Sequence, residues 1–161
     1  MILVYEGKYL NGERNGKGKE YYRYYRGNLK FEGEYLNDKR NGKGKEYYEN
    51  GNLKFEGEYL NGKRNGKGKE YYENGNLNFE GEYLNGIING KIKVYYPDRK
   101  LKFEGEYLNG KINGKGKEYH FNGLLKFEGD YVNDKKWNGI GYNKNGQKKV
   151  KFIEGEISII K

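Results

Sequence analysis

The sequence predicts an all-β repeat protein, a single-layer, twisted antiparallel β-meander of about 13 strands with one hairpin per ~24-residue repeat. The first observation is a Glu-Gly pair that recurs along the chain at spacings of 26, 24, 24, 24, 24 and 26 residues. The second is strict apolar/polar alternation within each copy, with no 3.6-residue periodicity. The third is the fixed placement of 19 Tyr and 7 Phe in a chain that is only 34% hydrophobic. These aromatics provide enough apolar surface for a thin ordered layer.

The Glu-Gly spacing divides the chain into one array over residues 1–161. Its repeats are predicted at about 5–30, 31–54, 55–78, 79–102, 103–126 and 127–152, with a partial copy at 153–161 that starts around Glu154-Gly155. The wider last spacing indicates an added residue near Trp137 in the sixth repeat.

One repeat shows how the strands are predicted. From Leu53 to Leu60, alternate residues are apolar or glycine on one side and charged on the other, which is typical of a half-buried strand. Residues 65–72 alternate in the same way, and Leu60 falls on the charged side of the first strand. The four-residue segments 61–64 and 73–76 are rich in turn formers and are predicted as loops. Two strands of about eight residues and two loops of about four give the observed period.

The pairing of these strands can also be predicted. If Leu60 pairs with Asn65, then Glu56 faces Lys69 on the wet side and Gly57 faces Gly68 on the aromatic side. Opposite charges across antiparallel strands favour this register, and a tyrosine of a neighbouring strand is expected to lie over the bare glycine backbone. Three glutamates fall on the aromatic side, where an unpaired carboxylate is costly: Glu46, Glu70 and Glu118. Either a bulge before the Tyr-Tyr pair or a face open to solvent would explain them.

Composition narrows the classes of partner. The net charge of +9 raises nucleic acid and acidic membranes as partners. The excess lies toward the ends, however, with +4 over residues 1–30, 0 over 31–54 and 55–78, and +3 over 127–152. A solvated ladder of paired charges is therefore favoured and nucleic acid is not. The chain has no cysteine and no apolar run of about 18 residues, so we expect a soluble, cytoplasmic protein. Both ends, Met1–Tyr5 and Ile157–Ile160, are apolar, which predicts self-association through terminal edge strands.

The repeated motif resembles the membrane occupation and recognition nexus, or MORN, repeat. The pattern is aromatic-x-Gly-x-aromatic followed by Gly-x-Gly, as in Phe31-x-Gly33-x-Tyr35 with Gly42-x-Gly44. It returns at 5–18, 55–68 and 103–116, and the resemblance covers about residues 5–157. The connector Tyr-Tyr-Glu-Asn-Gly-Asn-Leu is similar to bacterial repeats of the antitoxin-like MORN variant. The resemblance implies a repeat scaffold that binds proteins or lipids.

Two surfaces are candidates for binding. The first is the aromatic side, whose rows are predicted to hold the layer together and also to offer a partner-binding surface; its residues are Phe31, Tyr35, Phe55, Tyr59, Phe79, Tyr83, Phe103 and Tyr107. The second is the border of hairpin tips, whose basic residues would bind acidic phospholipid; they are Arg14, Lys39, Arg40, Lys63, Arg64, Lys111, Lys135 and Lys136.

Catalysis finds little support in the sequence. His120 is the only histidine, and it occupies the slot of Tyr48 and Tyr72, so it is interpreted as a substitute aromatic. No nucleophile–base pair, metal-ligand cluster or cofactor motif is recognisable, and we expect neither an enzyme nor a cofactor. In the fourth repeat, Ile87–Lys100 departs from the consensus, and drift is favoured there over a dedicated site.

The sequence thus predicts a non-catalytic scaffold for protein–protein interaction through its aromatic face or edge strands. The first alternative is peripheral binding to acidic phospholipid through the basic tips. The second is neutralisation of a partner toxin, which only the connector's resemblance suggests.

Overall fold

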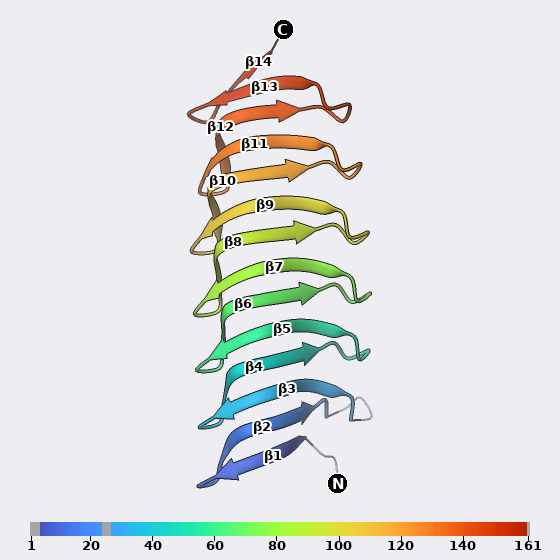
Figure 1. Cartoon of the computed structure of the whole chain (residues 1–161), viewed down its shortest axis with the longest axis vertical. Coiled ribbons are helices and arrows are strands. Elements are labelled where there is room, and N and C mark those ends of the chain that lie inside the picture. The colour runs from blue at the N-terminus through green and yellow to red at the C-terminus, as the bar shows by residue number, and fades with distance from the viewer. Residues whose placement is uncertain (1–3, 24–26, 161) are drawn as a thin grey trace. The chain divides into compact units, whose positions relative to one another are not determined.

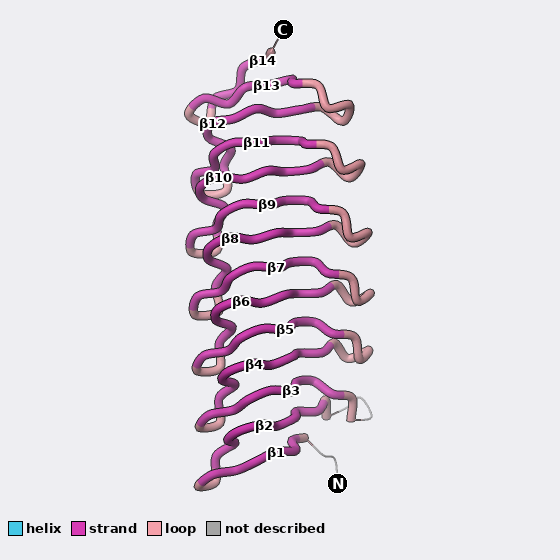
Figure 2. Tube along the Cα trace, viewed as in Figure 1, coloured by secondary structure: helices cyan, strands magenta, loops and turns pink. Residues whose placement is uncertain are grey.

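The computed structural model describes residues 4–23 and 27–160, and all regular structure in these ranges is β-strand. Fourteen strands follow one another in the sheet in chain order, and neighbours such as β1 and β2 or β3 and β4 pair antiparallel (Figure 1). The predicted all-β antiparallel meander is therefore confirmed. Tight turns join the strands at one end, along one long side of the sheet, and longer loops join them at the other end, along the opposite side (Figure 2). We call these the turn edge and the loop edge.

The strands have nearly constant lengths. The first seven are β1 (Tyr5–Leu10), β2 (Glu13–Tyr21), β3 (Leu29–Leu36), β4 (Lys39–Tyr47), β5 (Leu53–Leu60), β6 (Lys63–Tyr71) and β7 (Leu77–Leu84). The others are β8 (Ile87–Tyr95), β9 (Leu101–Leu108), β10 (Lys111–Tyr119), β11 (Leu125–Val132), β12 (Lys135–Tyr142), β13 (Lys148–Ile153) and β14 (Glu156–Ile159).

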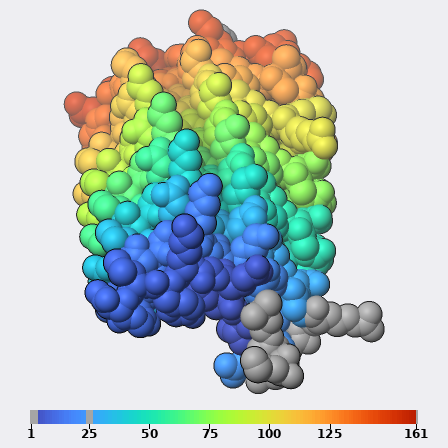
Figure 3. Space-filling model, turned by 60° about the horizontal axis from the view of Figure 1, so that its bottom comes forward, coloured from blue at the N-terminus to red at the C-terminus, as the bar shows by residue number. Residues whose placement is uncertain are grey.

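The chain forms two compact units, which we treat separately. The first comprises residues up to Leu77 together with Tyr83–Gly86, and the second comprises Asn78–Glu82 with the residues from Ile87 onward. In the first unit the turns stack from one hairpin to the next, since Gly62 N donates to Arg40 O and Gly86 N donates to Arg64 O, both at 2.8 Å. Side chains of its successive hairpins, blue to green in Figure 3, accordingly stand in rows. The single array over 1–161 stays a prediction.

The turns at the turn edge have two residues, not the predicted four. Asn61 and Gly62 have φ of 51° and 82°, the left-handed pair of a type I′ turn, for which Asn-Gly is the favoured sequence. Leu60 consequently pairs with Lys63, and the predicted pair of Leu60 with Asn65 is wrong. Lys63 and Arg64 belong to β6 instead of a loop.

A bulge restores the predicted register farther along the same hairpin. Between Tyr59, which faces Arg64, and Gly57, which faces Gly68, β6 contains two residues more than β5. Gly66 lies in this bulge with φ of 74°. Beyond it, Glu56 pairs with Lys69, as the charge pattern predicts.

A second bulge lies where the sequence suggested one. Glu46 pairs with Phe55, and the next residue, Tyr47, pairs with Leu53, so the register shifts just before the Tyr-Tyr pair. The same shift occurs between Glu20 and Tyr21 and between Glu118 and Tyr119. The predicted bulge is therefore present, but Glu46 still lies on the aromatic side opposite Phe55, so the bulge alone does not explain the inward glutamates.

The core of the layer is built on glycine pairs. A Cβ on Gly57 would lie 2.6 Å from Phe55 Cζ, and one on Gly68 would lie 2.6 Å from Phe55 Cε2. The Phe55 ring therefore rests directly on backbone that only glycine leaves bare. The covering ring is mainly the phenylalanine of the same hairpin; Tyr83 from a later hairpin touches Gly68 more loosely, at 3.2 Å.

The C-terminal repeats differ from the prediction. Glu154 and Gly155, with φ of 50° and 85°, form a two-residue turn between β13 and β14 and do not start a seventh copy of the Glu-Gly strand. The bulge of the sixth repeat is one residue shorter than that of the second. It has two residues between Lys136 and Gly139, whereas the second repeat has three between Arg40 and Gly44. The prediction of an added residue near Trp137 is therefore wrong, because a residue is missing there. The turn at Glu154-Gly155 also adds the strand β14, so that the strand count is 14 and not about 13.

The terminal segments are described in part. Of Met1–Tyr5, residues 1–3 lie outside the described residues. In β14, Ile157 and Ile159 are 63% and 81% exposed. Self-association through terminal strands stays a prediction.

Candidate functional site

The aromatic rows lie inside the layer. Seven of the eight predicted residues are no more than 5% exposed, and Tyr107 is partly exposed; the seven are Phe31, Tyr35, Phe55, Tyr59, Phe79, Tyr83 and Phe103. Their rings pack edge to face, as in Phe31 with Tyr59, whose centroids lie 5.4 Å apart. Edge-to-face pairs of this kind add about 0.5–1.5 kcal/mol to the effect of burial. These side chains hold the layer together, and they offer almost no surface to a partner.

Arginines cover the rings from the turn edge. The type I′ turn and the bulge together direct Arg40 and Arg64 onto the aromatic side, where each guanidinium carbon lies 3.9 Å from a phenylalanine centroid, Phe31 and Phe55 respectively. The same guanidinium groups pair with the inward carboxylates. Arg64 Nη2 lies 3.4 Å from Glu46 Oε2 and Nη1 lies 2.6 Å from Glu70 Oε1.

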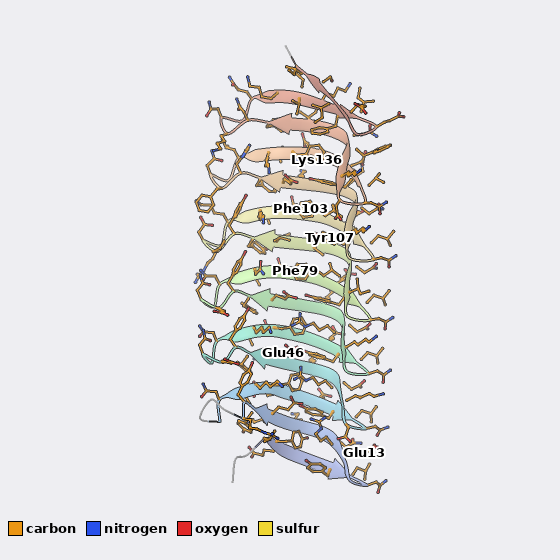
Figure 4. The ribbon with its side chains drawn as sticks, turned by 180° about the vertical axis from the view of Figure 1, so that it is seen from behind. Glu13, Glu46, Phe79, Phe103, Tyr107 and Lys136 are labelled. Atoms are coloured by element: carbon orange, nitrogen blue, oxygen red, sulfur yellow. The ribbon has the colours of Figure 1, made fainter. Side chains whose placement is uncertain are left out.

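These contacts form a continuous polar ladder in the first unit. The order along it is Arg14, Glu20, Arg40, Glu46, Arg64 and Glu70, each ion-paired with the next. Tyrosine hydroxyls complete the partners of the carboxylates; Tyr59 donates to Glu46 at 2.5 Å. Figure 4 shows Glu46 within the width of the sheet and Glu13 out at the turn edge.

Contacts within the ladder shift the pKa values of its carboxylates and tyrosines. Burial alone would raise the pKa of Glu46, but the Tyr59 hydroxyl and the Arg64 and Arg40 guanidinium groups outweigh it, so that the pKa is lowered. Burial raises the pKa of Tyr59, and the hydrogen bond to Glu46 raises it further. The carboxylate is therefore ionised and the phenol neutral at pH 7. This is the arrangement of a structural ion-pair network, and the predicted cost of a buried carboxylate is removed by its partners.

The basic tips divide into two groups. Arg14, Arg40, Arg64 and Lys136 are engaged on the aromatic side; Lys136 Nζ, for example, lies 3.1 Å from Glu118 Oε2. Only the other four of the predicted lipid-binding residues point into solvent: Lys39, Lys63, Lys111 and Lys135.

The fourth repeat replaces the ladder by apolar residues in a concerted way. Val94 pairs with Phe103 as Glu46 pairs with Phe55. Around Val94, Ile88 and Ile112 occupy the positions that Arg40 and Arg64 occupy around Glu46. The carboxylate and both of its cations are thus absent together around Val94. Drift of this repeat, favoured over a dedicated site, stays a prediction.

The loop edge carries a second repeated contact. The hydroxyl of Tyr48 donates to Tyr71 O at 2.7 Å, and that of Tyr96 donates to Tyr119 O at 2.9 Å. His120 makes the equivalent contact through Nε2 to Tyr142 O at 3.1 Å. Its interpretation as a substitute aromatic is confirmed.

The face opposite the aromatic side has two exposed features. In the second unit, Lys and Glu side chains of β8–β11 line a shallow depression of about 530 Å³ over the glycines Gly105, Gly116 and Gly129. In the first unit, four leucines stand at the turn edge, one per hairpin: Leu10 (59% exposed), Leu36 (47%), Leu60 (47%) and Leu84 (51%). We call these four residues the leucine row.

The leucine row is the surface that the sequence interpretation missed. The signal was present, because strand alternation places Leu60 with Lys54, Glu56 and Glu58 on the wet side. A leucine on the wet face of one strand is unremarkable. A leucine at the same position of successive hairpins forms a regular row, in which the tip lysines Lys39 and Lys63 of the intervening strands lie between the leucines.

Other kinds of site have no support in the described residues. Residues 4–23 and 27–160 contain no group of three or more His, Cys, Asp or Glu placed to hold a metal ion. The same ranges contain no helix long and apolar enough to cross a membrane.

A family model described as MORN repeat matches five segments of the chain, at residues 5–23, 31–53, 55–77, 79–98 and 103–124. No curated protein matches the chain. The sixth repeat, with its shortened bulge, lies outside the matched segments.

Proposed function

Because the chain belongs to the MORN repeat family, a non-enzymatic family whose repeats generally bind proteins or lipids, we propose that it is a scaffold that binds a partner protein along the leucine row. The single observation that carries this proposal is the exposure of four leucines at equivalent positions, while the aromatic rows are buried. A single exposed leucine needs no explanation, but its repetition at one place of four successive hairpins, beside exposed lysines, supports an interaction surface.

The rigidity of the hairpins supports the same proposal. Leu60 and Leu84 lie next to two-residue turns whose glycines donate to the preceding hairpin, Gly62 N to Arg40 O and Gly86 N to Arg64 O. At Leu36 the turn residue Asp38 donates to Arg14 O in the same way. Beneath these turns, the ladder of Arg40, Glu46 and Arg64 fixes the aromatic side. A preorganised surface loses little conformational entropy on binding.

Site-specific photo-cross-linking tests the proposal. A photoreactive side chain at position 60 should capture a protein in an extract of the native cells, and mass spectrometry identifies it. The matched control carries the same group at position 43, an exposed lysine on the same face away from the leucine row. Equal capture from both positions, or no protein captured from position 60, would contradict the proposal.

The second candidate is attachment to acidic lipid, which the four exposed tip lysines favour. Lys39 and Lys63 lie beside the leucine row, and Lys111 and Lys135 hold the same place in the second unit. A lysine near an acidic surface adds about 1 kcal/mol. Flotation with phosphatidylserine vesicles tests it: binding should weaken as salt rises and should be lost when all four lysines are changed to glutamine.

Two further expectations stay predictions. Toxin neutralisation would be one form of protein binding, and its basis is the resemblance of the connector alone. The cytoplasmic location is likewise a prediction from composition.

A further inference from the structure

Resting on the proposed function, we infer that the leucine row of the first unit takes a partner segment in the polyproline-II conformation with an apolar side chain at every third position and acidic residues between them. The argument starts from the spacing of the row. Equivalent residues of successive hairpins are two strands apart, and neighbouring strands lie about 4.7–4.9 Å apart, so the leucines repeat every ~9.4–9.8 Å.

The register of the first unit makes this spacing regular. Leu36 pairs with Lys39, and Leu60 pairs with Lys63, each directly beside its turn. The turn glycines pack on the preceding hairpin: a Cβ on Gly62 would lie 3.9 Å from Lys39 Cβ, and one on Gly86 would lie 3.8 Å from Lys63 Cβ. The turn edge therefore advances by one hairpin at a time without a slip, and its leucines keep a common spacing.

Only one regular backbone matches this spacing along the whole row. Polyproline II has three residues per turn and a rise of about 3.1 Å, so every third side chain returns to the same face after ~9.3 Å. An α-helix returns after seven residues and about 10.5 Å, and over the three steps of the row it overshoots by roughly 2–3 Å. An extended β-strand turns its third side chain to the opposite face. A polyproline-II segment deviates by roughly 1 Å over the same distance, which side-chain rotation absorbs.

The polar surroundings agree with this class of partner. A polyproline-II segment carries a solvated backbone and needs no ladder of hydrogen bonds from its receptor, and the leucine row offers apolar contacts instead. Lys39 and Lys63 flank Leu36 and Leu60 and form no ion pair among the described residues, so two cations remain for acidic side chains of the partner. A flat acidic bilayer on this face would also meet the neighbouring carboxylates Glu34 and Glu58, which a narrow segment along the edge avoids.

Synthetic peptides test the inference with the chain itself. The probe is a fluorescent (Leu-Pro-Glu)₄ peptide, in which leucine recurs every third residue and proline favours polyproline II. The comparison peptide has the same composition with leucines at irregular spacings of two and four. By fluorescence anisotropy, the regular peptide should bind at least ten-fold more tightly, and replacement of its glutamates by lysines should weaken binding several-fold.

Variants of the chain assign the binding surface. The double change Leu36→Ser with Leu60→Ser should reduce binding at least ten-fold, while Lys43→Ser with Lys67→Ser, on the same face away from the row, should leave it within two-fold. An unchanged thermal midpoint shows that the leucine variant is folded. Equal affinity for the two peptides, or undiminished binding by the folded leucine variant, overturns the inference. Tighter binding of an amphipathic helical peptide would also overturn it but would leave the proposed function standing.

Discussion

The guanidinium group of Arg64 lies over the ring of Phe55, with Cζ 3.9 Å from the ring centroid. The ring has no exposed surface, and the same guanidinium pairs with two carboxylates, Glu46 and Glu70. One side chain thus seals the apolar core and neutralises the acids within it. This double contact explains how a sheet with no second layer keeps its aromatic rows out of water.

The first prediction concerns Arg64 directly. Arg64→Ala should lower the free energy of unfolding by about 2–3 kcal/mol, because it leaves two inward carboxylates with fewer partners and uncovers Phe55. This is less than the ~3–5 kcal/mol of a fully buried pair, since the arginine side chain is 22% exposed. Urea unfolding measures the change. The control is Lys63→Ala at the neighbouring exposed position, which should change stability by less than about 0.5 kcal/mol; similar losses in the two variants would refute the assignment.

The second prediction tests the concerted replacement in the fourth repeat. Val94→Glu should destabilise the protein by about 2–3 kcal/mol, because it places a carboxylate where Ile88 and Ile112 provide no cation. Adding Ile112→Arg should recover at least about 1 kcal/mol, because it places a cation beside position 94. A double-mutant cycle by urea unfolding gives the coupling energy. Additive effects of the two changes would show that the positions do not form a pair.

The third prediction concerns acid. The pKa values of Glu20, Glu46 and Glu118 are lowered by their hydroxyl and cationic partners against the opposing effect of burial. A lowered pKa contributes stability above the unfolded-state value, near 4.5, and this stability is lost as pH falls through the folded-state value. The free energy of unfolding should therefore fall below about pH 5. Glu46→Gln should be less stable at pH 7 and should show a shallower fall; an unchanged acid slope would contradict this.

The fourth prediction concerns alkali. Burial and a hydrogen bond to Glu104 raise the pKa of Tyr119 to about 12, and the equivalent bond to Glu80 acts on Tyr95 in the same way. A raised pKa contributes stability below the unfolded-state value, near 10, and loses it as pH rises toward the folded-state value. Stability should thus fall above about pH 10. Absorbance at 295 nm should show tyrosines that ionise well above pH 10, fewer in Tyr119→Phe; ionisation of all tyrosines at pH 10 in the folded protein would refute it.

The period, the strands and the strand register beyond the bulge could be predicted from the sequence, because alternation and charge pairing are local signals. The sequence predicts Arg64 in a loop because the segment Asn61–Arg64 is rich in turn formers, and composition alone does not show that only two of these residues make the turn. The two-residue turn at Asn61-Gly62 moves the register by two residues, and the bulge at Gly66 moves it back, so Glu56 still meets Lys69. The two deviations cancel beyond the bulge and are visible only between it and the turn, where the arginines lie.

The candidate site was less predictable for a related reason. Burial of the aromatic rows depends on side chains from two neighbouring hairpins; Tyr83, for example, covers the ring of Phe55. Alternation gives the face of a residue but not what lies on it. Exposure of the leucine row is the converse case, since alternation places Leu60 on the wet face but does not say that it stays 47% exposed.

The last prediction concerns the glycine under Phe55. In an ordinary strand, glycine to alanine stabilises by about 0.4–1 kcal/mol, because the unfolded chain loses freedom. At Gly68 the added methyl group would lie 2.6 Å from a ring that Arg64 and Tyr59 hold in place, and overpacking costs about 1–3 kcal/mol. The clash should win, so Gly68→Ala should be destabilising while Lys67→Ala is neutral. The fourth repeat shows what happens when a larger side chain is accommodated, because Ile92 stands at the position of Gly68. There Tyr107 is partly exposed, and its ring centroid lies 6.2 Å from that of Phe103, whereas the centroids of Tyr59 and Phe55 lie 5.6 Å apart. A stabilised Gly68→Ala protein, by urea unfolding, would mean that the ring can move aside at no cost.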